Sequence, residues 1–265
     1  MMGPVEFNAP LYDMHLHLHA APTPERYVQA ATLQGVTHFA CMSATLTELP
    51  HLIALKQQFG RQVRLFVGCH PQWAASFSPQ DFYQALRSPF IAGIGECGLD
   101  KRPTVLAVAP LEVQLKVLKL QLQAAFDFDL PVSIHCVKAH NELLSLLRPY
   151  QGKLRFCLHG VNLSTPLLDA YLKLNAYISI GKLALEPHCA LLKSIQERYS
   201  DAFCKILLES DYAGKLLGPH FYQQVLTSLA TTFKLDCNYL HAQLARHSQE
   251  FFADGISFLS STRTQ

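Results

Sequence analysis

The stretch LYDMHLHL at residues 11–18 is the first of eight short β-rich runs in this chain of 265 residues. The other seven are VTHFACM, VRLFVGCH, FIAGIGE, LPVSIHC, LRFCLHG, NAYISIG and CKILLESD. Helical periodicity follows these runs, most clearly in PLEVQLKVLKLQLQAAF at 110–126, where leucines recur at helical spacing after Pro110. Strand–helix alternation of this kind predicts an α/β fold, a (β/α)₈ TIM barrel of eight parallel strands and outer helices, as a single domain over residues 1–265.

A doubly wound open sheet is the competing architecture, and it requires a glycine-rich phosphate loop after an early strand. No G-x-G-x-x-G motif follows the first run. The nearest match, GIGECG at residues 93–98, belongs to the fourth run and carries a glutamate. No linker or low-complexity tract divides the chain, so the barrel is favoured. The segments 220–233 and 237–252 are expected to be its last helices, with His241 and His247 at the surface.

The composition restricts the class of protein. Charged residues make up 16% of the chain and the net charge is +2, so no basic patch argues for duplex DNA binding. This composition is still compatible with a hydrolase that binds one or two phosphates of a nucleic acid locally. The N-terminus lacks the pattern of a signal peptide, and no apolar run is as long as a membrane span. The eight cysteines form no C-x-x-C pair. We therefore expect a cytoplasmic protein with no membrane association and no obligate protein partner.

Ionisable residues interrupt the apolar runs near their ends. Barrel strands are buried on both faces and should be nearly all apolar, and the active site of such a barrel lies at the carboxyl ends of its strands. These residues are therefore expected to converge on one rim. They are His15, His17, His70, Glu96, His135, His159, Glu209 and Asp211.

The residue types at this rim select a chemistry. Imidazole and carboxylate together suit a divalent transition metal, whereas an all-oxygen site would suit magnesium or calcium. Six ligands with one shared carboxylate match a two-metal site, which lowers the pKa of a water and neutralises charge on a phosphoryl or carbonyl oxygen. The pattern therefore predicts a hydrolase with two divalent cations, either Mg, Mn or Zn.

The motifs are also recognisable as a set. The chain resembles the TatD family of metal-dependent deoxyribonucleases, within the amidohydrolase-like barrel superfamily. The resemblance rests on DMHLH, GCHP, GIGECGLD, LPVSIHC, HG followed by AYISIG, and LLESD, which occur in this order over most of the chain. One H-x-H pair is a weak signal, but six ordered motifs are a strong one.

The resemblance implies a role for each of these residues. One metal would be held by His15, His17 and Asp211, and the other by His135 and His159, with Glu96 bridging both. Asp211 and Glu96 would be the catalytic residues, Asp211 handling the proton of the attacking water. Glu209 would support the ligands without binding metal. So would Asp13, which is expected to share the inward face of the first strand and to orient a histidine. His19 is expected in a loop.

The substrate-binding residues depart from the family pattern. Val137 stands where the family often has an arginine, and Lys138 offers only a point charge in its place. GLDKR replaces GLDYY, and the loop after Asp211 is shortened. His70 and Lys138 are the predicted substrate contacts. We expect an intact metal site with a divergent substrate-binding surface.

Three functions follow as hypotheses. The leading one is a 3′-to-5′ exonuclease that hydrolyses phosphodiester bonds at the ends of single-stranded DNA or RNA. The second is an amidohydrolase-type enzyme that cleaves a C–N or C–O bond in a small molecule, since the arginine is lost and the loop is short. The third is a catalytically silent metal-binding barrel.

Overall fold

The computed structural model describes residues 9–199, 205–215 and 217–253. The predicted domain over 1–265 therefore includes residues 1–8, 200–204, 216 and 254–265, which lie outside this description, as does Cys204. Eight parallel strands follow one another around a single sheet in chain order. They are β1 (Leu11–Leu16), β2 (Val36–Met42), β3 (Val63–Val67), β4 (Ile91–Asp100), β5 (Val132–Val137), β6 (Phe156–Leu158), β7 (Tyr177–Ile180) and β8 (Ile206–Leu208).

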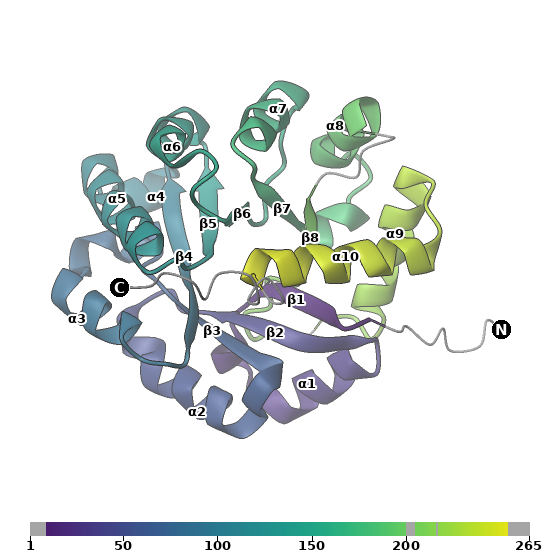
Figure 1. Cartoon of the computed structure of the whole chain (residues 1–265), viewed down its shortest axis with the longest axis horizontal. Helices are drawn as coiled ribbons and strands as arrows, with labels where there is room; N and C mark the ends of the chain where they lie inside the picture. The colour runs from purple at the N-terminus through teal and green to yellow at the C-terminus, as the bar shows by residue number, and fades with distance from the viewer. Residues whose placement is uncertain (1–8, 200–204, 216, 254–265) are drawn as a thin grey trace, which may run out of the picture.

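The first and last strands close this sheet (Figure 1). An isolated parallel bridge joins Leu16 to Tyr212, just beyond the end of β8. The amide of His17 donates to the carbonyl of Tyr212 at 2.7 Å, and the amide of Asp211 donates to the carbonyl of His15 at 2.9 Å. The predicted TIM barrel is confirmed, and its closing seam carries three of the predicted metal ligands.

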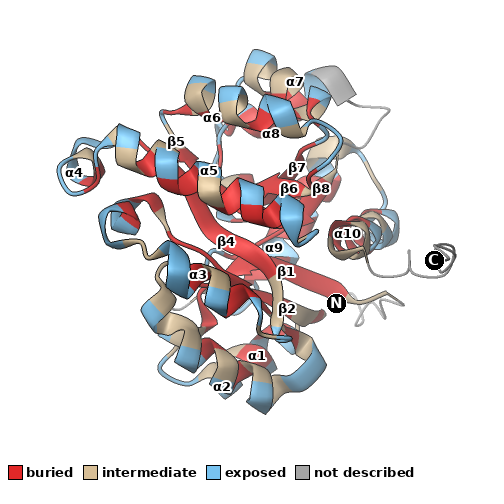
Figure 2. Cartoon of the chain, turned by 60° about the vertical axis from the view of Figure 1, so that its left-hand side comes forward, coloured by how far each residue is buried: buried red, intermediate tan, exposed pale blue. Residues whose placement is uncertain are grey.

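Helices surround the barrel, and Figure 2 shows that they turn buried residues toward the strands and exposed ones outward. The three helices predicted at 110–126, 220–233 and 237–252 are confirmed as α5, α9 and α10. The α-helices are α1 (Pro24–Thr32), α2 (Leu49–Phe59), α3 (Pro79–Leu86), α4 (Pro103–Leu106), α5 (Leu111–Asp127), α6 (His140–Leu147), α7 (Thr165–Lys173), α8 (Ala190–Tyr199), α9 (Phe221–Phe233) and α10 (Cys237–Phe252).

The barrel interior is filled by side chains from strands all around the sheet. Tyr12 and Met14 of β1 form one buried cluster with Phe66 of β3 and Leu207 of β8. Phe251 of α10 joins this cluster, and α10 lies against β1 and β8. Packing from α10 therefore closes the barrel at the end opposite to the polar rim.

Several predicted details were wrong. β4 does not end near Glu96 but continues to Asp100, so Glu96 lies inside the strand. β1 ends at Leu16, and the following residues form a short 3₁₀ helix. His241 and His247 are buried, because α10 packs its inner side against the barrel. Within the described part of the chain, no helix has the length and apolarity needed to cross a membrane.

Candidate metal centre

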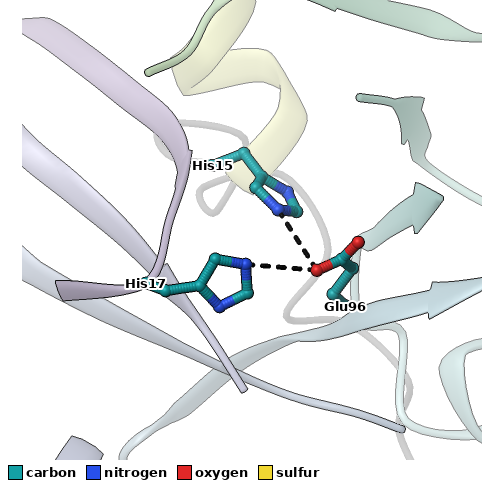
Figure 3. A group of neighbouring side chains, drawn as sticks. All are labelled: His15, His17 and Glu96. Carbon is teal, nitrogen blue, oxygen red and sulfur yellow. Dashed lines mark ion pairs between the residues drawn. The ribbon is translucent and has the colours of Figure 1, made fainter. Parts of the chain in front are cut away.

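The carboxylate of Glu96 lies at the centre of the polar rim, surrounded by imidazoles from four strands or the loops that follow them. Figure 3 shows two of these rings, His15 and His17, directed at the carboxylate. Glu96 is almost completely buried, with its side chain 7% exposed. The nitrogen–oxygen distances to Glu96 are 2.9 Å from His159 Nε2, 3.1 Å from His135 Nδ1, 3.1 Å from His17 Nε2, 3.6 Å from His70 Nε2 and 3.7 Å from His15 Nε2.

An irregularity in β4 places Glu96 among these rings. The register between β4 and β5 shifts between Ile94 and Cys97, and such bulges re-aim side chains next to active sites. Gly98 follows with φ +151°, and a Cβ there would overlap the backbone carbonyl of His135. The GIGECGLD motif therefore lets β4 approach β5 closely, which brings Glu96 and His135 together.

His15 is held from behind by a residue that the sequence did not single out. Its Nδ1 lies 2.8 Å from the hydroxyl of Ser133 on β5, and both residues are fully buried. Its Nε2 is buried without a hydrogen-bond partner and faces Glu96 at 3.7 Å and Asp211 at 4.0 Å. If Nδ1 carries the proton and donates it to Ser133, the Nε2 lone pair is directed into the site. This is the arrangement of a metal-ligating histidine.

The prediction that Asp13 shares the inward face of β1 was wrong. Its carboxylate accepts hydrogen bonds from the hydroxyl of Ser210 at 2.6 Å and from the amide of Ser210 at 2.9 Å. The hydroxyl of Tyr222 on α9 donates to it at 2.6 Å. A register shift between Asp13 and Leu16 breaks the alternation of the strand. Asp13 therefore contacts His15 only through the main-chain amide of His15, at 3.3 Å. It fixes the main chain beside Asp211 and does not orient the imidazole of His15.

The end of β8 supplies two carboxylates in different surroundings. The side chain of Asp211 is 52% exposed, and its Oδ1 lies 4.0 Å from His15 Nε2. Glu209 is buried and accepts a hydrogen bond from the amide of Gly160 at 2.9 Å. It thus contacts the residue after His159, and burial raises the pKa of Glu209 to about 7. Asp211 is open to solvent and substrate, whereas Glu209 contacts the loop that positions His159.

Asp100 is a further member of the site that the sequence reasoning missed. Its carboxylate is buried, lies 3.2 Å from His135 Nε2 and accepts a 2.7 Å hydrogen bond from Arg102 Nε. The guanidinium and the imidazole hold the pKa of Asp100 well below its usual range, although burial alone would raise it. The signal was present in GIGECGLD, because an aspartate at the end of a buried strand needs a partner.

The charges in the cluster are strongly coupled. Burial opposes ionisation of Glu96, but His159, His135 and His15 keep its pKa well below the ordinary value. Burial also disfavours protonated His135, yet hydrogen bonds to Asp100 and Glu96 outweigh it and raise the pKa of His135 to about 9. Burial lowers the pKa of His15 to about 4, and the neighbouring His159 contributes. The site thus combines an ionised acid with a neutral imidazole at His15.

These residues fit a divalent cation. Among the described residues, nitrogen and carboxylate atoms within 4.8 Å of one another form four overlapping groups, and three of the groups together contain all six predicted ligands. A buried imidazole nitrogen without a partner, His15 Nε2, faces two of those carboxylates. The groups are His15, His17 and Glu96; His15, His159 and Asp211; Glu96, His135 and His159; and His70, Asp100 and His135.

The predicted substrate contacts lie at different positions. His70 follows β3, and its Nδ1 accepts a hydrogen bond from the amide of Gln72 at 3.1 Å, which directs Nε2 toward Glu96. Lys138 follows β5 and is exposed. His19 lies beyond β1, as expected, but in a 3₁₀ helix instead of a loop, and it pairs with Glu48 at 3.5 Å. His70 is therefore part of the cluster, whereas Lys138 is on its edge.

Comparison with known proteins decides the family. A model of the family described as TatD related DNase matches residues 12–253. The chain belongs to this family. Human 3'-5' RNA nuclease TATDN2 is 30% identical over 223 residues, which are 81% of this chain and 26% of that protein. The 3'-5' ssDNA/RNA exonuclease TatD of Edwardsiella piscicida is 32% identical over 157 residues, which are 58% of this chain and 59% of the relative. The match thus spans less than two thirds of either relative.

Solved TatD structures share the fold. The TatD homologue YJJV of Escherichia coli K12 superposes with a TM-score of 0.81 and 22% identity, covering 92% of this chain and 98% of that one. A TatD family hydrolase of Entamoeba histolytica gives a TM-score of 0.75 and 15% identity, covering 93% and 99%. At these identities the superpositions support the barrel, and the TatD assignment rests on the family model.

Proposed function

We propose that this TatD family member is a metal-dependent hydrolase of phosphodiester bonds, a 3′-to-5′ exonuclease that acts on the ends of single-stranded DNA or RNA. The observation that carries the proposal is the convergence of five imidazoles on the buried carboxylate of Glu96. The nuclease names of the two relatives favour this substrate over a small amide or ester.

Six residues are proposed to hold two divalent ions. His15, His17 and Asp211 would bind one ion, His135 and His159 the other, and Glu96 both. When bound, such ions act as Lewis acids toward a phosphoryl oxygen and lower the pKa of a water. Protein groups fix the ring orientations: Ser133 contacts His15, and Asp100 contacts His135.

Asp211 is the proposed proton acceptor for the attacking water. Its carboxylate is half exposed, so it can exchange the proton with solvent after each turnover. Glu96 cannot exchange a proton in this way, because it is buried and five imidazoles surround it. The two acids would therefore have separate roles: Glu96 would help to hold the metal ions, and Asp211 would accept the proton.

The depth of the site favours action on ends. Glu96 lies inside β4 instead of at its end, and the side chains of Glu96 and His17 are 7% and 11% exposed. The terminal phosphodiester of a flexible strand can reach buried groups of this kind more easily than a linkage in the middle of a chain. We therefore expect a linear single strand to be degraded and a circular single strand of the same sequence to resist.

The test combines metal quantification with digestion of end-labelled oligonucleotides. Purified protein should contain or bind a divalent ion, and with Mg, Mn or Zn it should shorten a 5′-labelled strand one nucleotide at a time. His135→Ala should abolish cleavage while the circular dichroism spectrum is unchanged. Undiminished cleavage by this variant, or a protein that binds no divalent ion, would contradict the proposal. A parallel panel of small esters, lactones and amides tests the alternative substrate class.

A further inference from the structure

A groove opens on the rim beside the metal centre, between the loops that follow β2 and β3, which are neighbouring strands (Figure 1). Its volume is about 520 Å³, within the range of about 300–1,000 Å³ that small-molecule sites occupy. Leu46, Trp73 and Phe77 provide its apolar surface. The metal site does not use any of these side chains, so the groove needs an explanation of its own.

Trp73 is the only tryptophan of the chain, and it is 46% exposed. It lies in the 3₁₀ helix η4 (Pro71–Ser76), directly after the GCHP motif. A large indole left half in water does not contribute fully to the packing of the fold. Proteins that bind single strands use such exposed aromatic rings as stacking surfaces for bases.

Main-chain contacts join the groove to the metal centre on one side. The amide of Trp73 donates to the carbonyl of His70 at 2.8 Å, and the amide of His70 donates to the carbonyl of Ala44 at 2.9 Å. His70 Nε2 in turn lies 3.6 Å from Glu96. The two loops that line the groove are thus tied together through a residue that contacts the central carboxylate.

A second series of contacts joins the groove to the metal centre on the other side. Glu48 lines the groove and pairs with His19 at 3.5 Å. The ring of His19 packs edge-on to that of His17, with centroids 5.8 Å apart, and His17 contacts Glu96. A substrate end at the metal centre therefore has the groove next to it.

The charge of the groove distinguishes a base from a phosphate. Glu48 and Asp81 are both in its lining, and the lining residues that the structure describes include no lysine or arginine. These carboxylates repel a phosphate but accept hydrogen bonds from the N–H groups of bases, including the ring N–H of thymine. We propose that Trp73 stacks on an unpaired nucleobase of the substrate, next to the nucleotide whose phosphodiester is cleaved. This inference rests on the proposed nuclease function.

The single tryptophan gives a direct binding signal. The metal-loaded wild-type protein is titrated with a single-stranded octathymidylate whose phosphorothioate linkages resist hydrolysis, and with an abasic octamer of the same linkages. Competition against an end-labelled strand measures the affinity of each. We expect the octathymidylate to quench the emission of Trp73 and to bind about tenfold more tightly than the abasic octamer. Equal quenching and equal affinity would overturn the base subsite.

Kinetics supply an independent test. Trp73→Ala should raise KM for a single-stranded DNA substrate about tenfold, the loss expected for one stacked base, with the larger share of the change in KM and not in kcat. Trp73→Phe should recover most of the affinity. The matched control is Phe90→Ala, since Phe90 is 38% exposed and lies just before β4, at the opposite end of the barrel.

The experiments distinguish an error in the proposed base subsite from an error in the proposed nuclease function. If the wild type degrades oligonucleotides and Trp73→Ala has the same KM as Phe90→Ala, the base subsite is wrong and the nuclease assignment stands. If the wild type degrades no oligonucleotide, the nuclease function is wrong, and equal binding of the two octamers would then reject the groove as well.

Discussion

Ser133→Ala removes the group that orients His15, and its effect can be worked out from the structure. The hydroxyl of Ser133 lies 2.8 Å from His15 Nδ1, and both residues are fully buried, so water cannot replace it. A buried polar atom left without its partner costs about 1–3 kcal/mol. Without the hydroxyl the imidazole can adopt the other tautomer, which puts a proton on Nε2 where the metal should bind. Metal affinity should therefore fall about 10–100-fold, the usual range for a lost partner of a metal ligand.

The assay is a titration of metal-free protein with a divalent ion, by calorimetry or by competition with a chelating dye. Ser248→Ala is the matched control, because Ser248 is also a buried serine whose hydroxyl is hydrogen-bonded, in its case to the carbonyl of Leu244 at 2.9 Å in α10. Both variants should lose some thermal stability, but only Ser133→Ala should lose metal affinity. If the two variants bind metal equally well, Ser133 does not orient His15 and the tautomer argument is wrong.

Three further predictions concern Asp211, the protonation of His135 and the close approach of β4 to β5 at Gly98. Asp211→Asn should reduce kcat at least about 100-fold, the contribution of a positioned base, while the melting temperature stays near that of the wild type because the side chain is half exposed. The pKa of His135 in the metal-free protein is raised to about 9, so its ring is protonated at pH 7. Metal binding should therefore release a proton, and the affinity for the metal should rise up to about tenfold per pH unit until pH 9. Calorimetry in two buffers of different ionisation enthalpy measures the proton release, and equal apparent enthalpies would refute it. Gly98→Ala should abolish metal binding or prevent folding, because its methyl group would overlap the carbonyl of His135; a soluble variant with wild-type metal affinity would show that β4 and β5 can separate there at little cost.

The fold was predictable because its signal is local. Buried parallel strands are short apolar runs, and the run VTHFACM coincides with β2, Val36–Met42. The helical periodicity after Pro110 likewise gave α5 to within one residue at each end. Strand ends were less predictable, because the polar residues that interrupt a run need not end it. Glu96 interrupts β4 without ending it, since the bulge turns its side chain into the barrel while the backbone keeps pairing with β5 to Asp100.

The residues around the metal centre likewise include some that the sequence predicts and some that it does not. Ionisable side chains in apolar runs are conspicuous in a sequence, and this made His135, His159 and Asp211 candidates. Ser133 is an ordinary small residue in the same run, and only the closure of the barrel brings it to His15, 118 positions away. A contact of this kind depends on the stagger between strands, which no local pattern reports.

The alternation in LYDMHLHL illustrates the same limit inside a single strand. In a regular strand, Asp13 and His15 would point to the same face. The shift in register after Asp13 breaks this relation, so His15 faces Glu96 while Asp13 faces Tyr222 on the outer helix α9. Asp13 then binds the amide and hydroxyl of Ser210, the residue before Asp211. One strand therefore supplies a proposed ligand on its inner side and, on its outer side, the carboxylate that holds the chain beside the proposed proton acceptor. A substitution at Asp13 should thus act on the site through the closing seam of the barrel, even though its carboxylate contacts none of the predicted ligand side chains.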